Sequence, residues 1–179
     1  METFTDPKQL VENPQYQKQR RKTLAGLRDG MIDAPILGVV NGFNTLPYCF
    51  TLQCCCGHFL HNDVKESNNL ESLPVTNTIS VVEYSIAYIA FCVENSDMGR
   101  RFLDALKDIT ALDPETIQFG SAEWFWKRQV NSYVLQVEPT VWKYEDTATL
   151  DYGEALRTEK VRDELFVHLQ GLLKKQLTV

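Results

Sequence analysis

The chain has 179 residues, of which 44% are hydrophobic and 23% are charged, and its formal net charge is −6. This length suits one ordinary domain, and the apolar fraction is high enough to offset the backbone entropy lost on folding, which excludes wholesale disorder. The acidic excess argues against a protein that binds nucleic acid mainly through charge, because contacts with phosphates require Lys and Arg. Because the sequence contains no repeats and no linker-like tracts, we expect a single domain over residues 1–179, with residues 1–13 at most a mobile arm.

The sequence also predicts where the protein works. No run approaches the ~18–20 uncharged apolar residues that a membrane span needs, and residues 1–19 lack the basic and then apolar pattern of a signal peptide. The five cysteines, three of them consecutive, do not resemble the even and spaced framework of a secreted disulfide protein. We therefore expect a cytoplasmic protein with free thiols and no membrane partner.

Periodicity and capping signals divide the first half of the chain into two helices and two strands. Asp33 followed by Pro35 begins a helix, because proline is tolerated in the first helical turn. Alternation with a period of two starts at Tyr48 and is typical of a half-buried strand. The elements expected in chain order are a helix over 14–28, a helix over 34–43, a strand from Tyr48 to about Cys56, a long polar loop over 61–78 and one central strand over 80–94.

The second half contains two further helices and a pair of strands. Ser96 or Asp97 can cap a helix whose apolar residues share one face. Gly120 and Ser121 predict a break between two strands that form an antiparallel pair. The expected elements are a helix over 97–110, strands over 116–120 and 131–138, and a helix over 158–175. Because these elements are interspersed without strict βαβ alternation, the predicted class is α+β, with a largely antiparallel sheet and helices packed on it.

The segment Cys54-Cys55-Cys56-Gly57-His58 is the chemically unusual part of the sequence. Alternate residues of a strand point to opposite sides, so Cys54 and Cys56 continue its apolar face and core packing explains them. Cys55 continues the polar face that carries Thr51, which makes it the better candidate for chemistry. His58 would line the following turn, where backbone N–H groups can bind an anion and an imidazole can lower a thiol pKa.

The same segment offers ligands for a metal ion. Cys56, His58 and His61 are donors within a short stretch, and Cys54 would complete a set of four. Neighbouring positions on an extended strand do not converge easily on one tetrahedral ion, and no separate Cys-x-x-Cys pair closes a structural zinc site. The spacing therefore argues against a metal centre, and a metal- or redox-responsive cysteine domain stays open as an alternative.

A second candidate region follows Gly120. Three aromatic residues stand directly before two cations in the run Trp124–Arg128, and aromatic faces beside cations can stack a base and hold a phosphate. Core packing explains at least two of these rings more simply. We interpret Ser121, Trp124, Asn131 and Tyr133 as candidate ligand-binding residues. The alternative is a structural or protein-interaction domain whose aromatic run forms the partner surface.

Two segments together resemble a known family. Residues 24–33 read Leu-Ala-Gly-Leu-Arg-Asp-Gly-Met-Ile-Asp, and a strand ends in Phe-Thr-Leu-Gln-Cys-Cys-Cys-Gly-His at residues 50–58. This pattern resembles the tRNA wybutosine-synthesising methyltransferase family, whose signature reads approximately Phe-Thr-Thr-Ser-Ser-Cys-Ser-Gly-Arg. The matching residues are Phe50, Thr51, Cys55 and Gly57. Cys54, Cys56 and His58 replace two serines and the arginine of the signature, and the family's downstream Gly-Gly-x-Trp segment has no counterpart.

The resemblance implies a function and a site. It implies an S-adenosylmethionine-dependent methyltransferase-like fold that acts on a modified guanosine in tRNA, with the Cys54–His58 segment at the ligand site. S-adenosylmethionine is the implied cofactor and a nucleoside-like small molecule the implied ligand, whereas the acidic charge disfavours tRNA as a partner. The candidate catalytic residues are Cys55 and His58, and the candidate ligand-binding residues of this segment are Thr51, Cys54, Cys56 and Gly57.

Overall fold

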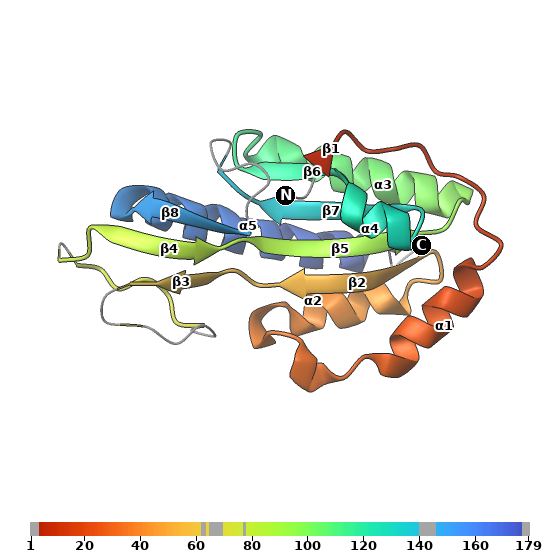
Figure 1. The fold of residues 1–179 in the computed structure, drawn as a ribbon, viewed down its shortest axis with the longest axis horizontal. Coiled ribbons are helices and arrows are strands. Elements are labelled where there is room, and N and C mark those ends of the chain that lie inside the picture. Colours follow the sequence, from red (N-terminus) through yellow and green to blue (C-terminus); the bar gives the residue numbers. More distant parts are fainter. Residues whose placement is uncertain (1–3, 62–63, 65–69, 77, 140–145, 177–179) are drawn as a thin grey trace.

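The computed structural model describes residues 4–61, 64, 70–76, 78–139 and 146–176. Its strands form two antiparallel sheets that follow one another end to end (Figure 1). The larger sheet has the strand order β1-β6-β7-β5-β2 and the smaller one the order β3-β4-β8. The predicted α+β class with antiparallel pairing is therefore confirmed.

The helices and strands have the following bounds. The strands are β1 (Phe4–Thr5), β2 (Cys49–Cys55), β3 (His58–Leu60), β4 (Val81–Ser85), β5 (Ala87–Val93), β6 (Ile117–Ala122), β7 (Ser132–Val137) and β8 (Thr147–Asp151). The α-helices are α1 (Tyr16–Gly26), α2 (Ala34–Thr45), α3 (Asp97–Ile109), α4 (Glu123–Arg128) and α5 (Tyr152–Gln176). Among the described residues, every helix is too short or too polar to cross a membrane.

The main hydrophobic core lies between one face of the sheets and the helices α2, α3 and α5. Apolar residues spaced three or four positions apart along these helices supply it, and every side chain in the following list is buried. These are Ile36, Val40 and Phe43 of α2, Phe102 and Leu106 of α3, and Val161, Leu165 and Leu169 of α5. Local periodicity therefore identified the sides of the helices that form the core.

The opposite face of the larger sheet carries α1 and α4. Tyr16 of α1 packs on Phe50 of β2, and their ring centroids are 5.5 Å apart. Phe125 of α4 packs on Ala90 and Val134 of the two central strands. The aromatic run, which follows the first of the two predicted strands, forms this short helix, with Phe125 buried and Trp124 exposed.

Two strand predictions are corrected by the structure. The apolar run over 80–94 is divided at Ile86, so that β4 belongs to the smaller sheet and β5 to the larger one. The expected break at Gly120 and Ser121 is wrong, because β6 continues through both residues. Gly120 pairs with Val134 and Ser121 with β1, so partners on both sides keep this stretch extended.

The N-terminal segment, for which the sequence left a mobile arm open, lies docked on the larger sheet from β1 onward. β1 pairs with β6. Further along, the side-chain amide of Asn131 accepts a hydrogen bond from the backbone N–H of Val11 at 2.9 Å and donates one to its carbonyl at 2.8 Å. Tyr133 donates to the carbonyl of Lys8 at 2.8 Å, and Ser121 accepts from the N–H of Lys8 at 3.1 Å. Buried polar side chains thus attach this segment by its backbone.

Candidate functional site

A bulge in β2 sets the direction of the cysteine side chains. The pairing with β5 shifts by one residue between Thr51 and Gln53, so Thr51 pairs with Phe91 but Cys54 pairs with Ile89. Cross-strand partners share a face, and both Phe91 and Ile89 belong to the main core. Thr51 and Cys54 therefore lie on the core side of the sheet. The alternation with a period of two predicted Thr51 and Cys54 on opposite sides of the sheet. This prediction is wrong, because the bulge adds one residue between them.

Cys55 lies on the side opposite the main core, and therefore not on the face of Thr51, where the sequence predicted it. It pairs with Tyr88 at the end of β2 and is half-buried. Thr51 is separated from it by the sheet, and its hydroxyl oxygen accepts a hydrogen bond from the side-chain amide of Asn44 in α2 at 2.9 Å. Thr51 is therefore occupied in holding α2, whereas Cys55 remains partly accessible.

The turn after β2 brings Cys55 close to His58. Gly57 has a φ of +82°, a left-handed conformation that side chains with a Cβ rarely adopt. Its N–H donates to the sulfur of Cys55 at 3.4 Å, and the next residue, His58, begins β3. This one left-handed residue interrupts the extended chain between β2 and β3, which run in the same direction along β5 and β4.

Asp33 completes a compact cluster that sequence reasoning did not identify. It stands at the N-terminus of α2, yet its carboxylate makes no capping hydrogen bond within that helix. Instead Oδ2 accepts from the N–H of Cys56 at 2.8 Å and lies 3.5 Å from Nε2 of His58. Ligand atoms of Asp33, Cys55 and His58 all lie within 4.8 Å of one another. We call these three residues the Cys55 cluster.

Arg162 of α5 supports the turn from the other side. Its Nη1 donates to the carbonyl of Gly57 at 3.1 Å, and its guanidinium lies 5.0 Å from the centroid of the Phe59 ring. Ion pairs with Glu159 at 3.7 Å and Asp163 at 2.8 Å balance its charge. The contact joins residues that are far apart in the chain, so no local pattern in the sequence indicates it.

Burial controls the charge state of the cysteines. It raises the pKa of Cys54 to about 11, with Asp33 as the next cause. Burial also raises the pKa of Cys55, and the hydrogen bond from Gly57 only partly opposes this rise. The pKa of Cys56, which lies in the core, is raised by burial and by Asp33. The expectation that this turn lowers a thiol pKa is wrong, and all three thiols are protonated at neutral pH.

The other predicted ligand-binding residues lie apart from the Cys55 cluster. Ser121, Asn131 and Tyr133 hold the N-terminal segment, on or beside β6 and β7, which β5 separates from β2. Trp124 is 47% exposed and stacks with its own neighbour Arg128, whose guanidinium carbon is 3.5 Å from the ring centroid. The structure thus brings together the residues of the cysteine segment and separates them from the aromatic run.

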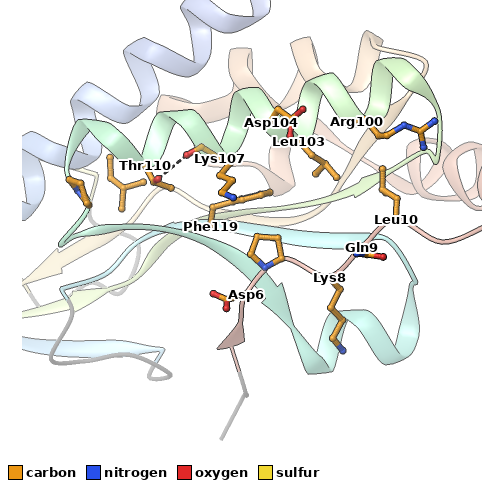
Figure 2. A pocket seen from close by; sticks show the side chains of 13 residues that line it. Asp6, Lys8, Gln9, Leu10, Arg100, Leu103, Asp104, Lys107, Thr110 and Phe119 are labelled. Atoms are coloured by element: carbon orange, nitrogen blue, oxygen red, sulfur yellow. Dashed lines mark hydrogen bonds between the residues drawn. The ribbon is translucent and has the colours of Figure 1, made fainter.

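A groove lies between the N-terminal segment and α3 (Figure 2). Its volume is about 880 Å³, and Lys8, Leu103, Lys107 and Phe119 are among the residues that line it. Volumes of this size are common for small-molecule sites. The groove shares no residue with the Cys55 cluster, so the two are separate features of the molecule.

Comparison with known proteins gives a likeness in fold only. No protein-family model matches the sequence, and no curated protein sequence matches it. The chain is similar in structure to the PH1069 protein from Pyrococcus horikoshii, with a TM-score of 0.50 over 88% of this chain and 95% of that chain. The two sequences are 7% identical, so the similarity shows a shared arrangement of helices and strands and nothing about the site.

Proposed function

We propose that the protein is an S-adenosylmethionine-dependent, methyltransferase-like protein that holds a nucleoside of tRNA beside the Cys54–His58 turn. The meeting of the two segments that carry the family resemblance supports this proposal. Asp33 ends the first segment, and the N–H of Cys56 in the second segment donates to its carboxylate at 2.8 Å. Two segments that resemble the family separately in the sequence are therefore neighbours in space.

A line of cations along β2 supports tRNA as the substrate despite the acidic average. Residues 14–28 contain no acidic residue. Arg20 donates to the carbonyl of Cys49 at the start of β2, and Asp33 contacts Cys56 just beyond its end, so the chain between them follows this strand. The exposed cations on this path are Arg21, Lys22 and Arg28, and Lys18 lies just before it. A phosphate backbone placed along them would meet positive charge next to the Cys55 cluster.

The cluster suits proton transfer better than nucleophilic attack. Methyl transfer to a ring nitrogen that carries a proton releases that proton, which needs an acceptor. The imidazole of His58 lies 3.5 Å from the Asp33 carboxylate, which can orient the ring. Because burial keeps the Cys55 thiol protonated, we assign Cys55 to contact with the ligand and His58 to the uptake of the proton.

Binding of S-adenosylmethionine to the reduced, chelator-treated protein tests the site. We expect saturable binding in isothermal titration, and we expect the substitution Cys55→Ala to weaken it about tenfold, or ~1.4 kcal/mol. Gln53→Ala is the matched control, because Gln53 is exposed and lies on the same strand and face as Cys55. Its affinity and melting temperature should equal those of the wild type. Absence of binding to the wild type would refute the cofactor, and equal losses of affinity and stability in Cys55→Ala would refute the site.

A tRNA-binding assay tests the role of the exposed cations on and after α1, independently of the cofactor. Reversing two exposed charges with Arg21→Glu and Lys22→Glu should weaken tRNA binding at least tenfold at low salt and reduce its salt dependence. The control is Lys174→Glu with Lys175→Glu, which reverses two charges at the far end of the chain, on α5. If both double variants bind tRNA equally, the α1 face is not the binding surface.

A further inference from the structure

We infer that Asp33, Cys55 and His58 bind one divalent transition-metal ion of the zinc type. They offer one carboxylate oxygen, one sulfur and one ring nitrogen, and these atoms all lie within 4.8 Å of one another. Ligand atoms of a tetrahedral zinc ion with bonds of about 2.0–2.3 Å are about 3.3–3.8 Å apart. The most distant pair would therefore have to approach by only about one ångström.

The sequence argued against a metal site because neighbouring residues of an extended strand do not converge on one ion. The left-handed residue Gly57 interrupts the extended chain and removes this objection. Adjacent residues on a straight strand cannot surround one ion, but Cys55 and His58 lie on either side of a left-handed residue. Their Cys-x-x-His spacing matches the short spacing that is common between zinc ligands. The third ligand, Asp33, comes from the start of α2 instead of from the cysteine run. Cys56, a ligand in the set that the sequence suggested, is buried in the core.

Backbone groups already orient two of the three ligands. The N–H of Gly57 donates to the sulfur of Cys55 at 3.4 Å, and the N–H of Cys56 donates to the Asp33 carboxylate at 2.8 Å. Hydrogen bonds of this kind orient the ligands in protein metal sites and tune their affinity. The site is thus partly organised before an ion arrives, which reduces the cost of binding.

The local charge also suits a divalent cation. One carboxylate and one thiolate would neutralise the ion, with His58 as a neutral ligand. The cation Arg162 contacts the turn, and its pairs with Glu159 and Asp163 offset its charge. Binding exchanges the S–H bond of Cys55 for a bond from sulfur to the metal and releases one proton to the solvent. Three protein ligands leave a fourth position for water or for a donor atom of a small molecule.

Cobalt titration of the reduced, chelator-treated protein tests this inference. Cobalt(II) is a spectroscopic probe for zinc sites, and we expect one equivalent to bind with a thiolate-to-cobalt charge-transfer absorption. The substitution Cys55→Ser should remove this absorption, and Asp33→Asn and His58→Gln should each weaken binding at least tenfold. The control is Cys92→Ser, which alters a buried thiol elsewhere in the sheet and should leave stoichiometry and spectrum unchanged.

Several outcomes would overturn the inference. These are an absence of cobalt binding, binding without the thiolate absorption, and binding that Asp33→Asn and His58→Gln leave unchanged. Circular dichroism establishes that each variant is folded, and His58→Gln replaces Cys55→Ser as the decisive variant if the latter does not fold. The inference does not depend on methyl transfer, and it concerns a state of the protein in which His58 binds the ion and does not take up a proton. Because the S-adenosylmethionine titration uses metal-free protein, failure of either proposal leaves the other intact.

Discussion

Replacing Gly57 with alanine should destabilise the protein by about 3 kcal/mol and abolish binding of cobalt at the Cys55 cluster. A residue with a Cβ is strained at the φ of +82° found here. The new Cβ would also lie 2.8 Å from the Cβ of Ala87 and 3.0 Å from the ring of Tyr84. Both neighbours are buried in the core and have little room to move, so the turn itself must shift.

Gly38→Ala is the control for this substitution. Gly38 lies on the exposed side of α2, and a Cβ added there meets nothing within 4 Å. Alanine in a helix is favoured over glycine, so this variant should be about 0.5–1 kcal/mol more stable than the wild type. Urea denaturation measures both changes. A Gly57→Ala protein with wild-type stability and cobalt binding would show that the turn does not need its left-handed residue.

Removing the hydroxyl group of Tyr84 should cost about 2–4 kcal/mol of folding free energy. This fully buried hydroxyl donates to the carbonyl of Val137 and accepts from the N–H of Ala87, both at 2.9 Å. It thus joins β4 of the smaller sheet to β5 and β7 of the larger one. Tyr84→Phe retains the ring, which stacks on Phe59 at 4.7 Å, and leaves two buried backbone groups without their partner.

Tyr16→Phe is the matched control for Tyr84→Phe. The hydroxyl of Tyr16 makes one longer hydrogen bond, to the carbonyl of Pro47 at 3.2 Å. We therefore expect a loss of about 1 kcal/mol or less in urea denaturation. Equal losses in the two variants would mean that the bridge between the sheets adds nothing beyond an ordinary hydrogen bond.

Elements with local signals were predicted well from the sequence. Helix α3 begins as expected after Ser96, whose hydroxyl accepts from the N–H of Gly99 at 3.1 Å. Strand β8 and the first turns of α5 were missed, because β8 is extended through pairing with β4, far away in the chain. The division at Ile86 has a similar origin. The first half of this apolar run pairs in the smaller sheet and the second half in the larger one, whereas in the sequence the run has no visible division.

The candidate site was only half predictable for the same reason. Cys55 and His58 were identified, because they lie in one unusual stretch of sequence. Asp33 was recognised only as a helix start, and Arg162 was not recognised, since both meet the turn from distant parts of the chain. The bulge after Thr51 also escaped detection, because a period of two cannot reveal an inserted residue.

The contacts along β2 have one more consequence, for association between molecules. β2 is an edge of the larger sheet, and exposed backbone groups at such an edge invite pairing with another chain. Here side chains take the place of a strand: Arg20 binds the carbonyl of Cys49, Asn44 the N–H of Thr51, and Asp33 the N–H of Cys56. These three side chains cover part of the edge, so replacement of Asp33 would uncover a backbone N–H there as well as alter the Cys55 cluster.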